Sequence, residues 1–148
     1  MKEKKMKNRV AGIIYKDDYV LLVHREKGYG SEKMIYYGIR GGGVEENETL
    51  EEALRREILE EVGIEIEILN LENPFILEED ERKQYFYYCR YKSGTIGKGI
   101  GEEMKNDDYE NKGSYKKIEV RKNEIKNMDI RPTEIDIQEK ILEGYKII

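Results

Sequence analysis

The alternation of apolar and polar positions divides the chain into strand-type and helix-type segments. Short runs rich in valine, isoleucine and tyrosine predict β-strands, and apolar residues that recur every four positions predict helices. Strands are expected at 10–15, 19–24, 34–39, 64–68, 84–91 and 115–120, and helices at 50–62 and 133–143. This order of a hairpin, a strand, a helix, further strands and a closing helix is typical of an α/β domain.

The segment 50–62 carries both start and stop signals for a helix. Thr49 and Glu52 form a capping-box pattern, in which each side chain satisfies an otherwise unpaired backbone N–H of the other residue. Gly63 suits the left-handed conformation that ends many helices. The helix is expected to dock on a sheet through an apolar stripe made of Leu50, Leu54, Ile58 and Val62.

Three glutamates lie on a neighbouring face of this helix. Glu57, Glu60 and Glu61 stand at positions i, i+3 and i+4, within one turn, where like charges repel. The cluster therefore weakens the helix unless a cation neutralises it. Because the segment contains no histidine or cysteine, the expected cation is Mg²⁺ or Mn²⁺. Arg56 and Glu48 are candidates for an ion pair that ties the preceding loop to the helix.

The spacing of these residues is specific. Gly42 is followed by Glu48, then by Arg56-Glu57-Ile58, and then by Glu60-Glu61 and Gly63-Ile64. This pattern resembles the signature of the Nudix hydrolases, and every defined position is filled. A solvated acidic helix face would explain neither the glycines nor the arginine. The resemblance extends over essentially the whole chain, although only 42–64 is diagnostic.

The resemblance implies an α/β/α sandwich with a mixed β-sheet, formed by a single Nudix domain over residues 1–148. It also implies a metal-dependent hydrolase that cleaves the pyrophosphate linkage of a nucleoside diphosphate linked to another moiety, by attack of water on phosphorus. The expected partner is thus a small nucleotide or nucleotide-sugar derivative, and no organic cofactor is implied.

The resemblance assigns roles to individual residues. Glu57 and Glu61 are expected to be the principal ligands of Mg²⁺ or Mn²⁺, with Glu60 and a backbone carbonyl near Gly42 in support. The number of metal ions stays open. Glu48 and Gly63 are expected to support the motif structurally, and Arg56 belongs to the catalytic set.

The proton acceptor has several candidates. Glu57 and Glu61 are two of them, and the long glycine-containing segment 93–113 supplies Glu102 and Glu103. Relatives often contribute a further carboxylate from a loop at this point. A carboxylate beside a cation can act as a base, but the sequence does not rank the four candidates.

Two arginines are candidates for contact with substrate phosphate. Arg25 directly follows the strand 19–24, where relatives place a basic residue, and an ordinary surface arginine is the alternative. Arg40 stands where relatives usually carry proline, and it either reaches the substrate or is exposed to solvent. The glycines 41–43 after it are expected to form a tight turn that brings carbonyl oxygens close to a metal or phosphate.

Composition limits the class of partner. The chain has 148 residues, of which 40% are charged and 38% hydrophobic, and its net charge is −5. This charge argues against binding of long nucleic acid, but it admits a small polyphosphate screened by metal. Residues 1–8 are expected to be a basic flexible tail. No apolar run is long enough to span a membrane, and a homodimer is left open.

Cysteine usage indicates the compartment and a structural role. Cys89 is the only cysteine, so no internal disulfide is possible, and a cytoplasmic location is expected. Its place in an aromatic strand pattern predicts a buried structural thiol.

Three other functions compete with the hydrolase. A Nudix-fold nucleotide-binding or regulatory module would lack hydrolysis, but it would be expected to have lost motif carboxylates. An isopentenyl-diphosphate-isomerase-like enzyme would need a cysteine in its site. A structural Ca²⁺ protein would need closely spaced loop ligands, which the sequence does not contain. Substrate selectivity is expected in 26–33, Tyr36-Tyr37 and 93–113, where no substrate-specific motif is found.

Overall fold

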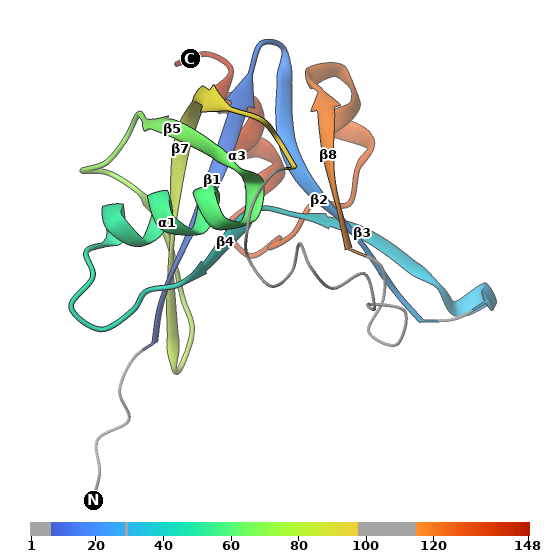
Figure 1. Ribbon diagram of the computed structural model, residues 1–148. Helices are drawn as coiled ribbons and strands as arrows, with labels where there is room; N and C mark the ends of the chain where they lie inside the picture. The colour runs from blue at the N-terminus through green and yellow to red at the C-terminus, as the bar shows by residue number, and fades with distance from the viewer. Residues whose placement is uncertain (1–6, 29, 98–114) are drawn as a thin grey trace, which may run out of the picture.

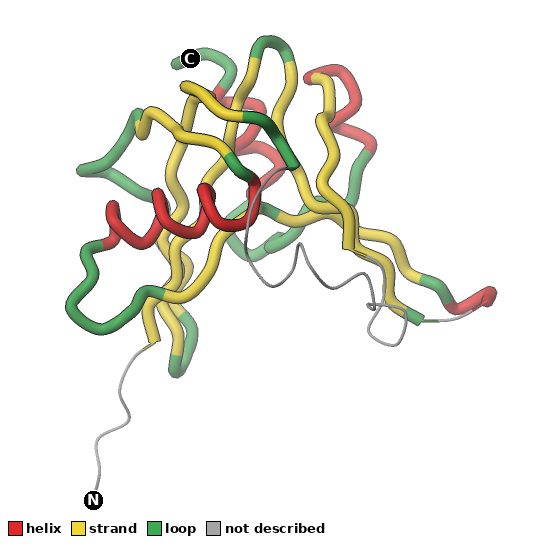
Figure 2. Tube along the Cα trace, in the orientation of Figure 1, coloured by secondary structure: helices red, strands yellow, loops and turns green. Residues whose placement is uncertain are grey.

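The computed structural model describes residues 7–28, 30–97 and 115–148. One mixed sheet of eight strands carries helix α1 (Leu50–Val62) on one face and helix α3 (Ile137–Gly144) on the other (Figures 1 and 2). This arrangement confirms the expected α/β/α sandwich. Within these ranges, neither helix is long and apolar enough to cross a membrane.

The sheet is built around two long neighbouring strands. Its strands are β1 (Lys7–Lys16), β2 (Tyr19–Lys27), β3 (Met34–Gly38), β4 (Arg40–Gly43), β5 (Ile64–Ile68), β6 (Phe75–Glu78), β7 (Arg82–Gly94) and β8 (Tyr115–Arg121). The main order is β3-β2-β1-β7-β5, and β4, β6 and β8 pair with β1, β7 and β2 respectively. The β1–β7 pair is parallel and the other strand pairs are antiparallel, so the sheet is mixed.

Several predicted elements lie where the sequence places them. The hairpin β1–β2 closes with Lys16 opposite Tyr19, and β7 lies between β1 and β5 as a central strand. Strand β1 begins at Lys7, so it includes the last two residues of the segment 1–8 that is expected to be a tail.

Apolar side chains fill both faces of the sheet. Under α1, a buried cluster includes Ile58 and Val62, and a second cluster under α3 includes Ile137 and Ile141. Tyr15 reaches through the second cluster and donates a hydrogen bond of 2.6 Å to the carbonyl of Ile141. Burial raises the pKa of the Tyr15 hydroxyl, so this donor stays protonated.

The closing helix differs from the prediction. A helix is expected from Thr133, but residues 133–136 form turns and α3 begins only at Ile137. Asp136 adopts a left-handed conformation with φ of 51°, which interrupts the helical path before Ile137. The buried positions Ile137 and Ile141 agree with the prediction. The short strand β6 and the 3₁₀ helices η1 (Gly30–Glu32) and η3 (Lys122–Asn127) are additional elements.

Candidate active site

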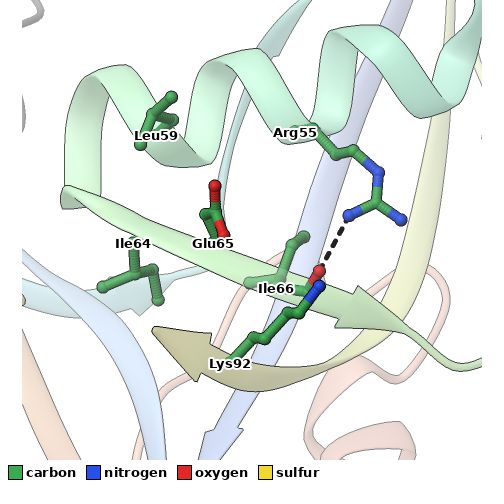
Figure 3. Close-up of a pocket in the computed structure, with 6 residues that line it drawn as sticks. All are labelled: Arg55, Leu59, Ile64, Glu65, Ile66 and Lys92. Atoms are coloured by element: carbon green, nitrogen blue, oxygen red, sulfur yellow. Dashed lines mark hydrogen bonds between the residues drawn. The ribbon is translucent and has the colours of Figure 1, made fainter. Parts of the chain in front are cut away.

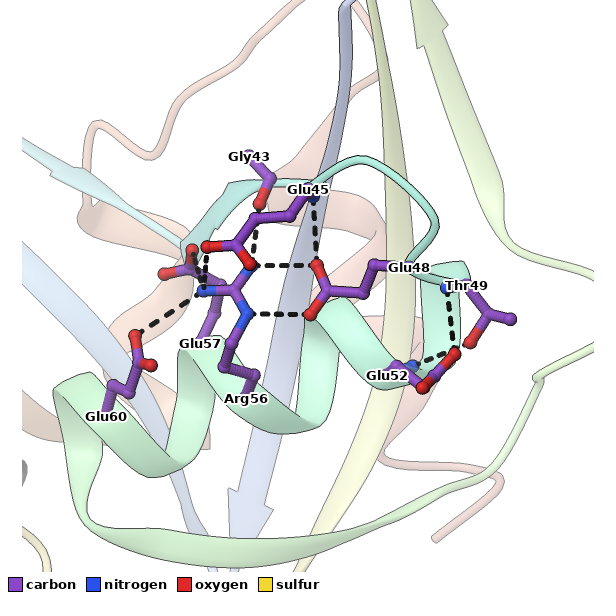
Figure 4. A network of polar contacts seen from close by, with 8 residues as sticks. All are labelled: Gly43, Glu45, Glu48, Thr49, Glu52, Arg56, Glu57 and Glu60. Carbon is purple, nitrogen blue, oxygen red and sulfur yellow. Dashed lines mark hydrogen bonds and ion pairs between the residues drawn. The ribbon is translucent and has the colours of Figure 1, made fainter.

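Helix α1 has the ends that its sequence predicts. The Thr49 Oγ1 accepts a hydrogen bond of 3.1 Å from the backbone N–H of Glu52, and Glu52 Oε1 accepts one of 3.0 Å from the N–H of Thr49 (Figure 4). Gly63, with φ of 85°, donates its N–H to the carbonyls of Ile58 and Leu59. Both caps are confirmed, and they fix where the helix starts and stops.

The apolar stripe of α1 orients its acidic face. Leu54, Ile58 and Val62 are almost fully buried against the sheet, together with Ala53. Side chains at 57 and 61 lie on one side of this stripe, within about 100° of its residues, so two of the glutamates lie along the same boundary between helix and sheet. The glutamates at this boundary are directed toward β4.

Strand β4 is the main difference from the expected site. The glycines 41–43 are predicted to form a tight turn, but Arg40–Gly43 is a strand that pairs with β1, opposite the segment Arg9–Gly12. A Cβ at Gly41 would overlap the carbonyl oxygen of Val10, so this position needs glycine for close backbone approach rather than for turning.

The helix and β4 match each other in spacing. Arg40 and Gly42 are two residues apart, about 6.6 Å along a strand, and point to the same face of the sheet. Glu57 and Glu61 are one helical turn apart, about 6 Å along the axis. As a result, the Glu57 carboxylate lies over Gly42, where a Cβ would overlap it, and the Glu61 carboxylate meets Arg40.

Arg56 ties the loop before α1 to two of the glutamates. Its Nε and Nη2 donate to the two carboxylate oxygens of Glu48 at 2.7 and 2.9 Å. Its Nη1 donates to Glu57 at 2.9 Å and to Glu60 at 3.4 Å, and its Nη2 also donates to the Gly43 carbonyl at 3.0 Å. Figure 4 shows this guanidinium between the carboxylates. The expected Arg56–Glu48 ion pair is confirmed.

These bonds change the acidity of Glu48. The pKa of Glu48 is lowered to about 2, mainly by the hydrogen bonds that the Arg56 side chain donates to it. The hydrogen bond from the backbone N–H of Glu45 lowers this pKa further. The same contacts raise the pKa of Arg56. The pair therefore stays charged in neutral solution and holds its geometry.

Arg40 is buried rather than exposed. Its side chain is 5% accessible, and its Nη2 lies 2.7 Å from Glu61 Oε2, whose side chain is 14% accessible. The alternative of a solvent-exposed Arg40 is therefore wrong. Arg40 also lines a cavity of about 320 Å³ beside Leu21, Val62 and Ile118. Sequence reasoning misses this ion pair because it depends on the strand character of β4.

The three motif glutamates are each engaged by an arginine. Arg56 contacts Glu57 and Glu60, and Arg40 contacts Glu61. Among the described residues, no three acidic, histidine or cysteine side chains converge in a group that could hold a metal ion. Two guanidinium groups thus lie beside the glutamates for which the sequence predicts Mg²⁺ or Mn²⁺.

The donor atoms nevertheless fit a hard divalent cation. The side chains of Glu57 and Glu61 are 12% and 14% accessible and that of Glu60 is 40% accessible, so all three are partly exposed, although Oε2 of Glu61 is itself buried. The missing side chain at Gly42 leaves the space that the Glu57 carboxylate occupies. Carboxylate oxygens at a partly exposed edge are the ligands that Mg²⁺ and Mn²⁺ prefer.

The remaining predicted residues lie on other strands or outside the described ranges. Arg25 is exposed on β2, in register with Tyr36 of β3, and alternation from Leu21 places it on the face of the sheet that α1 covers. Glu102 and Glu103 lie outside the described residues. Cys89 is buried, which raises the pKa of its thiol and confirms a structural role.

A separate cavity of about 200 Å³ lies beside the opposite side of α1. Its walls come from α1, β5 and β7, and Arg55 Nη1 donates to the Ile66 carbonyl at 2.8 Å there (Figure 3). Arg55 and Glu57 are two residues apart, so they point about 200° apart around the helix. This cavity is therefore not part of the glutamate cluster.

The sequence profile of the NUDIX domain family matches residues 5–114. The chain belongs to the NUDIX domain family. Similar solved structures support the same assignment of the fold. A NUDIX-family hydrolase from Clostridium perfringens has a TM-score of 0.68 and 23% identity, covering 97% of this chain and 99% of that chain. The MutT protein from Methanosarcina mazei Go1 has a TM-score of 0.62 and 19% identity, covering 99% of each chain.

A shorter match concerns a relative with an assigned activity. A nucleoside triphosphatase, NudI, from Enterobacter sp. (strain 638) is 48% identical over 46 residues. This match covers 31% of this chain and spans only about a third, 32%, of the relative. The expectation of a Nudix hydrolase is confirmed at the level of the family.

Proposed function

We propose that this Nudix hydrolase uses a divalent metal to cleave the pyrophosphate linkage of a nucleoside diphosphate linked to another moiety. The observation that carries the proposal is the placement of Glu57 over Gly42, with Glu61 one turn further along the same edge of α1. A solvated helix face would not need a glycine under a carboxylate. Packing of this kind holds an acidic group at a defined place.

Glu57 and Glu61 are the proposed principal ligands, supported by Glu60 and by a backbone carbonyl near Gly42. A bound Mg²⁺ or Mn²⁺ would neutralise phosphate charge and lower the pKa of the attacking water. A carboxylate oxygen that now contacts an arginine would have to exchange that contact to hold the cation. The partial exposure of all three side chains supports such an exchange.

Arg56 is the proposed positioning residue of the site. Its anchors on Glu48 and on the Gly43 carbonyl lie outside the glutamate trio, so the guanidinium has a fixed place that does not depend on Glu57. From this place it orients the Glu57 carboxylate toward Gly42. Arg25 faces the same side of the sheet, and we retain it as a candidate contact of substrate phosphate.

The general base is proposed to be one of four glutamates: Glu57, Glu61, Glu102 or Glu103. A base must reach the attacking water and must be able to accept its proton at the pH of the reaction. Conversion of each of the four to glutamine in turn, followed by pH–rate profiles, separates them. The base is the residue whose loss removes the acidic limb of the profile.

The substrate panel follows from the proposed linkage. It comprises nucleoside triphosphates, because a partial relative is named a nucleoside triphosphatase, together with ADP-ribose, dinucleoside polyphosphates, NADH, oxidised nucleotides and sugar nucleotides. Each is incubated with Mg²⁺ or Mn²⁺ while phosphate and pyrophosphate release is measured. Metal-dependent release of either product from one substrate class is the expected result.

A matched pair of variants tests the site itself. Glu61→Gln is expected to lower turnover by at least about 100-fold, the scale on which removal of an electrostatic group in a site acts. Glu67→Gln, at an exposed glutamate paired with Arg90 on the sheet, is the control and keeps full turnover. Unchanged turnover in Glu61→Gln removes that residue from the mechanism. Nucleotide binding without release of product identifies a binding or regulatory module instead.

The broader assignments stay proposals of the same kind. We propose a single domain over the whole chain, a cytoplasmic location consistent with the one buried thiol, and a small-molecule partner rather than long nucleic acid. Light scattering of the purified protein decides between a monomer and a homodimer.

A further inference from the structure

Arg40 forms an ion pair with Glu61, whose carboxylate the proposed mechanism assigns to the metal ion. We propose that Arg40 is an internal counter-cation, which holds Glu61 in place in the metal-free protein and competes with the divalent ion for that carboxylate. The inference rests on the proposed function, because it takes Glu61 to be a metal ligand. It concerns a position where the resemblance to Nudix hydrolases would lead one to expect proline.

The contact itself is short and buried. Nη2 of Arg40 lies 2.7 Å from Oε2 of Glu61, and the two side chains are only 5% and 14% accessible. The guanidinium group of arginine is in general always charged in proteins. A divalent cation bound by Glu61 would therefore lie close to a permanent positive charge that is shielded from solvent and already pairs with the same carboxylate.

The second arginine of the site behaves differently. Arg56 is 23% accessible and is anchored by Glu48 and the Gly43 carbonyl, which lie outside the trio. It can release Glu57 and remain paired and hydrated. Arg40 is held on β4 by the pairing of that strand with β1, and the spacing of strand and helix directs it at Glu61. Its charge therefore stays close to the metal after the exchange.

The expected consequence is a weaker metal affinity than the three glutamates alone would provide. In the metal-free protein, the same arginine offsets the repulsion between Glu57, Glu60 and Glu61. Removing one partner of a buried pair leaves the other charge uncompensated, which destabilises a protein. Arg40 thus stabilises the metal-free state and raises the concentration of metal that the site requires.

Mn²⁺ binding measured by electron paramagnetic resonance, without substrate, tests the inference. Arg40→Gln is expected to bind Mn²⁺ at least about tenfold more tightly than the unmodified protein, because a close charge pair couples at 1.4 kcal/mol or more. Arg90→Gln removes an exposed arginine from its 2.8 Å pair with Glu67 and serves as the control. Its affinity is expected within about twofold of the unmodified protein. Equal or weaker binding by Arg40→Gln overturns the inference.

The glutamate variants separate this inference from the proposed function. In a Glu61→Gln background, Arg40→Gln is expected to bring a smaller gain in Mn²⁺ affinity, because the competition for the carboxylate is gone and only the repulsion between Arg40 and the metal remains. A gain of undiminished size in this background overturns the inference. If the unmodified protein binds no Mn²⁺, or if Glu57→Gln and Glu61→Gln leave its affinity unchanged, the metal site fails and both proposals fall. If those variants weaken binding but Arg40→Gln does not strengthen it, only the counter-cation fails.

Two further measurements test the inference even if Arg40→Gln folds poorly. Thermal unfolding should show a lower Tm for metal-free Arg40→Gln and a larger increase of Tm with Mn²⁺ than in the unmodified protein. In the unmodified protein, the ¹⁵Nε–H resonance of Arg40 is expected to shift as Mg²⁺ is added, while that of Arg90 does not. An Arg40 resonance that stays unchanged at saturating Mg²⁺ contradicts the inference.

Discussion

Gly42→Ala is the substitution that separates the chemistry of the site from the stability of the fold. A Cβ at this position would overlap all three atoms of the Glu57 carboxylate group. These atoms are the far end of a flexible side chain, so the helix and the strand can stay where they are while the carboxylate moves. The substitution therefore displaces a proposed metal ligand without removing it.

The size of the effect follows from the overlap. The Glu57 carboxylate must move by about 1 Å to reach an ordinary contact distance from the new methyl group. A misplacement of about 1 Å in a catalytic constellation can cost about 100-fold in rate. A side chain forced from its preferred rotamer costs only about 1 kcal/mol, which corresponds to a Tm change of about 3 °C in a domain of this size.

The neighbouring glycines are matched controls. A Cβ at Gly43 meets no atom within 4 Å, so Gly43→Ala is expected to keep both activity and stability. A Cβ at Gly41 would lie 2.7 Å from the Cα of Ala11 and would overlap the Val10 carbonyl oxygen, so Gly41→Ala is expected to lower the Tm. The assays are kcat/KM on a substrate found in the panel, Mn²⁺ affinity and thermal unfolding.

One pattern of results would refute this reasoning. We expect Gly42→Ala to lose about 100-fold in kcat/KM and to bind Mn²⁺ more weakly, at a nearly unchanged Tm. If Gly42→Ala and Gly43→Ala have the same activity and the same Mn²⁺ affinity, the position of the Glu57 carboxylate over Gly42 has no catalytic importance.

Three further predictions concern stability. The pKa of Glu48 is lowered to about 2, so its ion pair with Arg56 stabilises the fold above the unfolded-state pKa of about 4.5 and the contribution is lost as pH falls toward 2. Allowing for screening by solvent, Glu48→Gln should lower the free energy of unfolding by about 1 kcal/mol at pH 7. Unfolding measured at decreasing pH should show this difference vanish near pH 2, and a constant difference would contradict the prediction. Tyr15→Phe removes the buried 2.6 Å bond to Ile141 and should cost about 1–2 kcal/mol in denaturant unfolding, whereas Tyr91→Phe, at an exposed bond to Gly94, should cost less than half as much. Thr49→Ala removes the N-cap of α1 and should lower the free energy of unfolding by about 1 kcal/mol in the same denaturant unfolding, and an unchanged value would contradict the role of the cap.

Helix α1 is predictable from sequence because its determinants are local. The capping box at Thr49, the left-handed Gly63 and the apolar stripe all act within a few residues of one another, and each is present in the structure. The Arg56–Glu48 pair is predictable for a similar reason, since both residues belong to one short motif. The family motif adds the α/β/α fold, which the structure and its neighbours confirm.

The environment of Arg40 is not predictable from local signals. Consecutive glycines allow many backbone conformations, and a turn is the usual interpretation of such a run. Pairing with β1, about thirty residues earlier in the chain, makes Arg40–Gly43 a strand instead. Only that strand geometry places Arg40 and Gly42 on the face of the sheet that contacts Glu61 and Glu57. A long-range backbone pairing thus determines the charge balance of the site.

The start of α3 is misjudged for a different reason. Thr133 after a proline is a frequent helix start, and the apolar positions Ile137 and Ile141 continue the expected period. The left-handed backbone at Asp136 interrupts the helix before it reaches them. Aspartate tolerates this conformation better than most residues, but its sequence alone does not show that it adopts it.

Anomalous diffraction from crystals soaked in Mn²⁺ tests the central claim most directly. The account predicts a Mn²⁺ peak bonded to carboxylate oxygens of Glu57 and Glu61 at about 2–2.5 Å, with Arg40 displaced from Glu61. A map with no peak at this place at saturating Mn²⁺, and with Arg40 and Arg56 still bound to the three glutamates, would contradict the account.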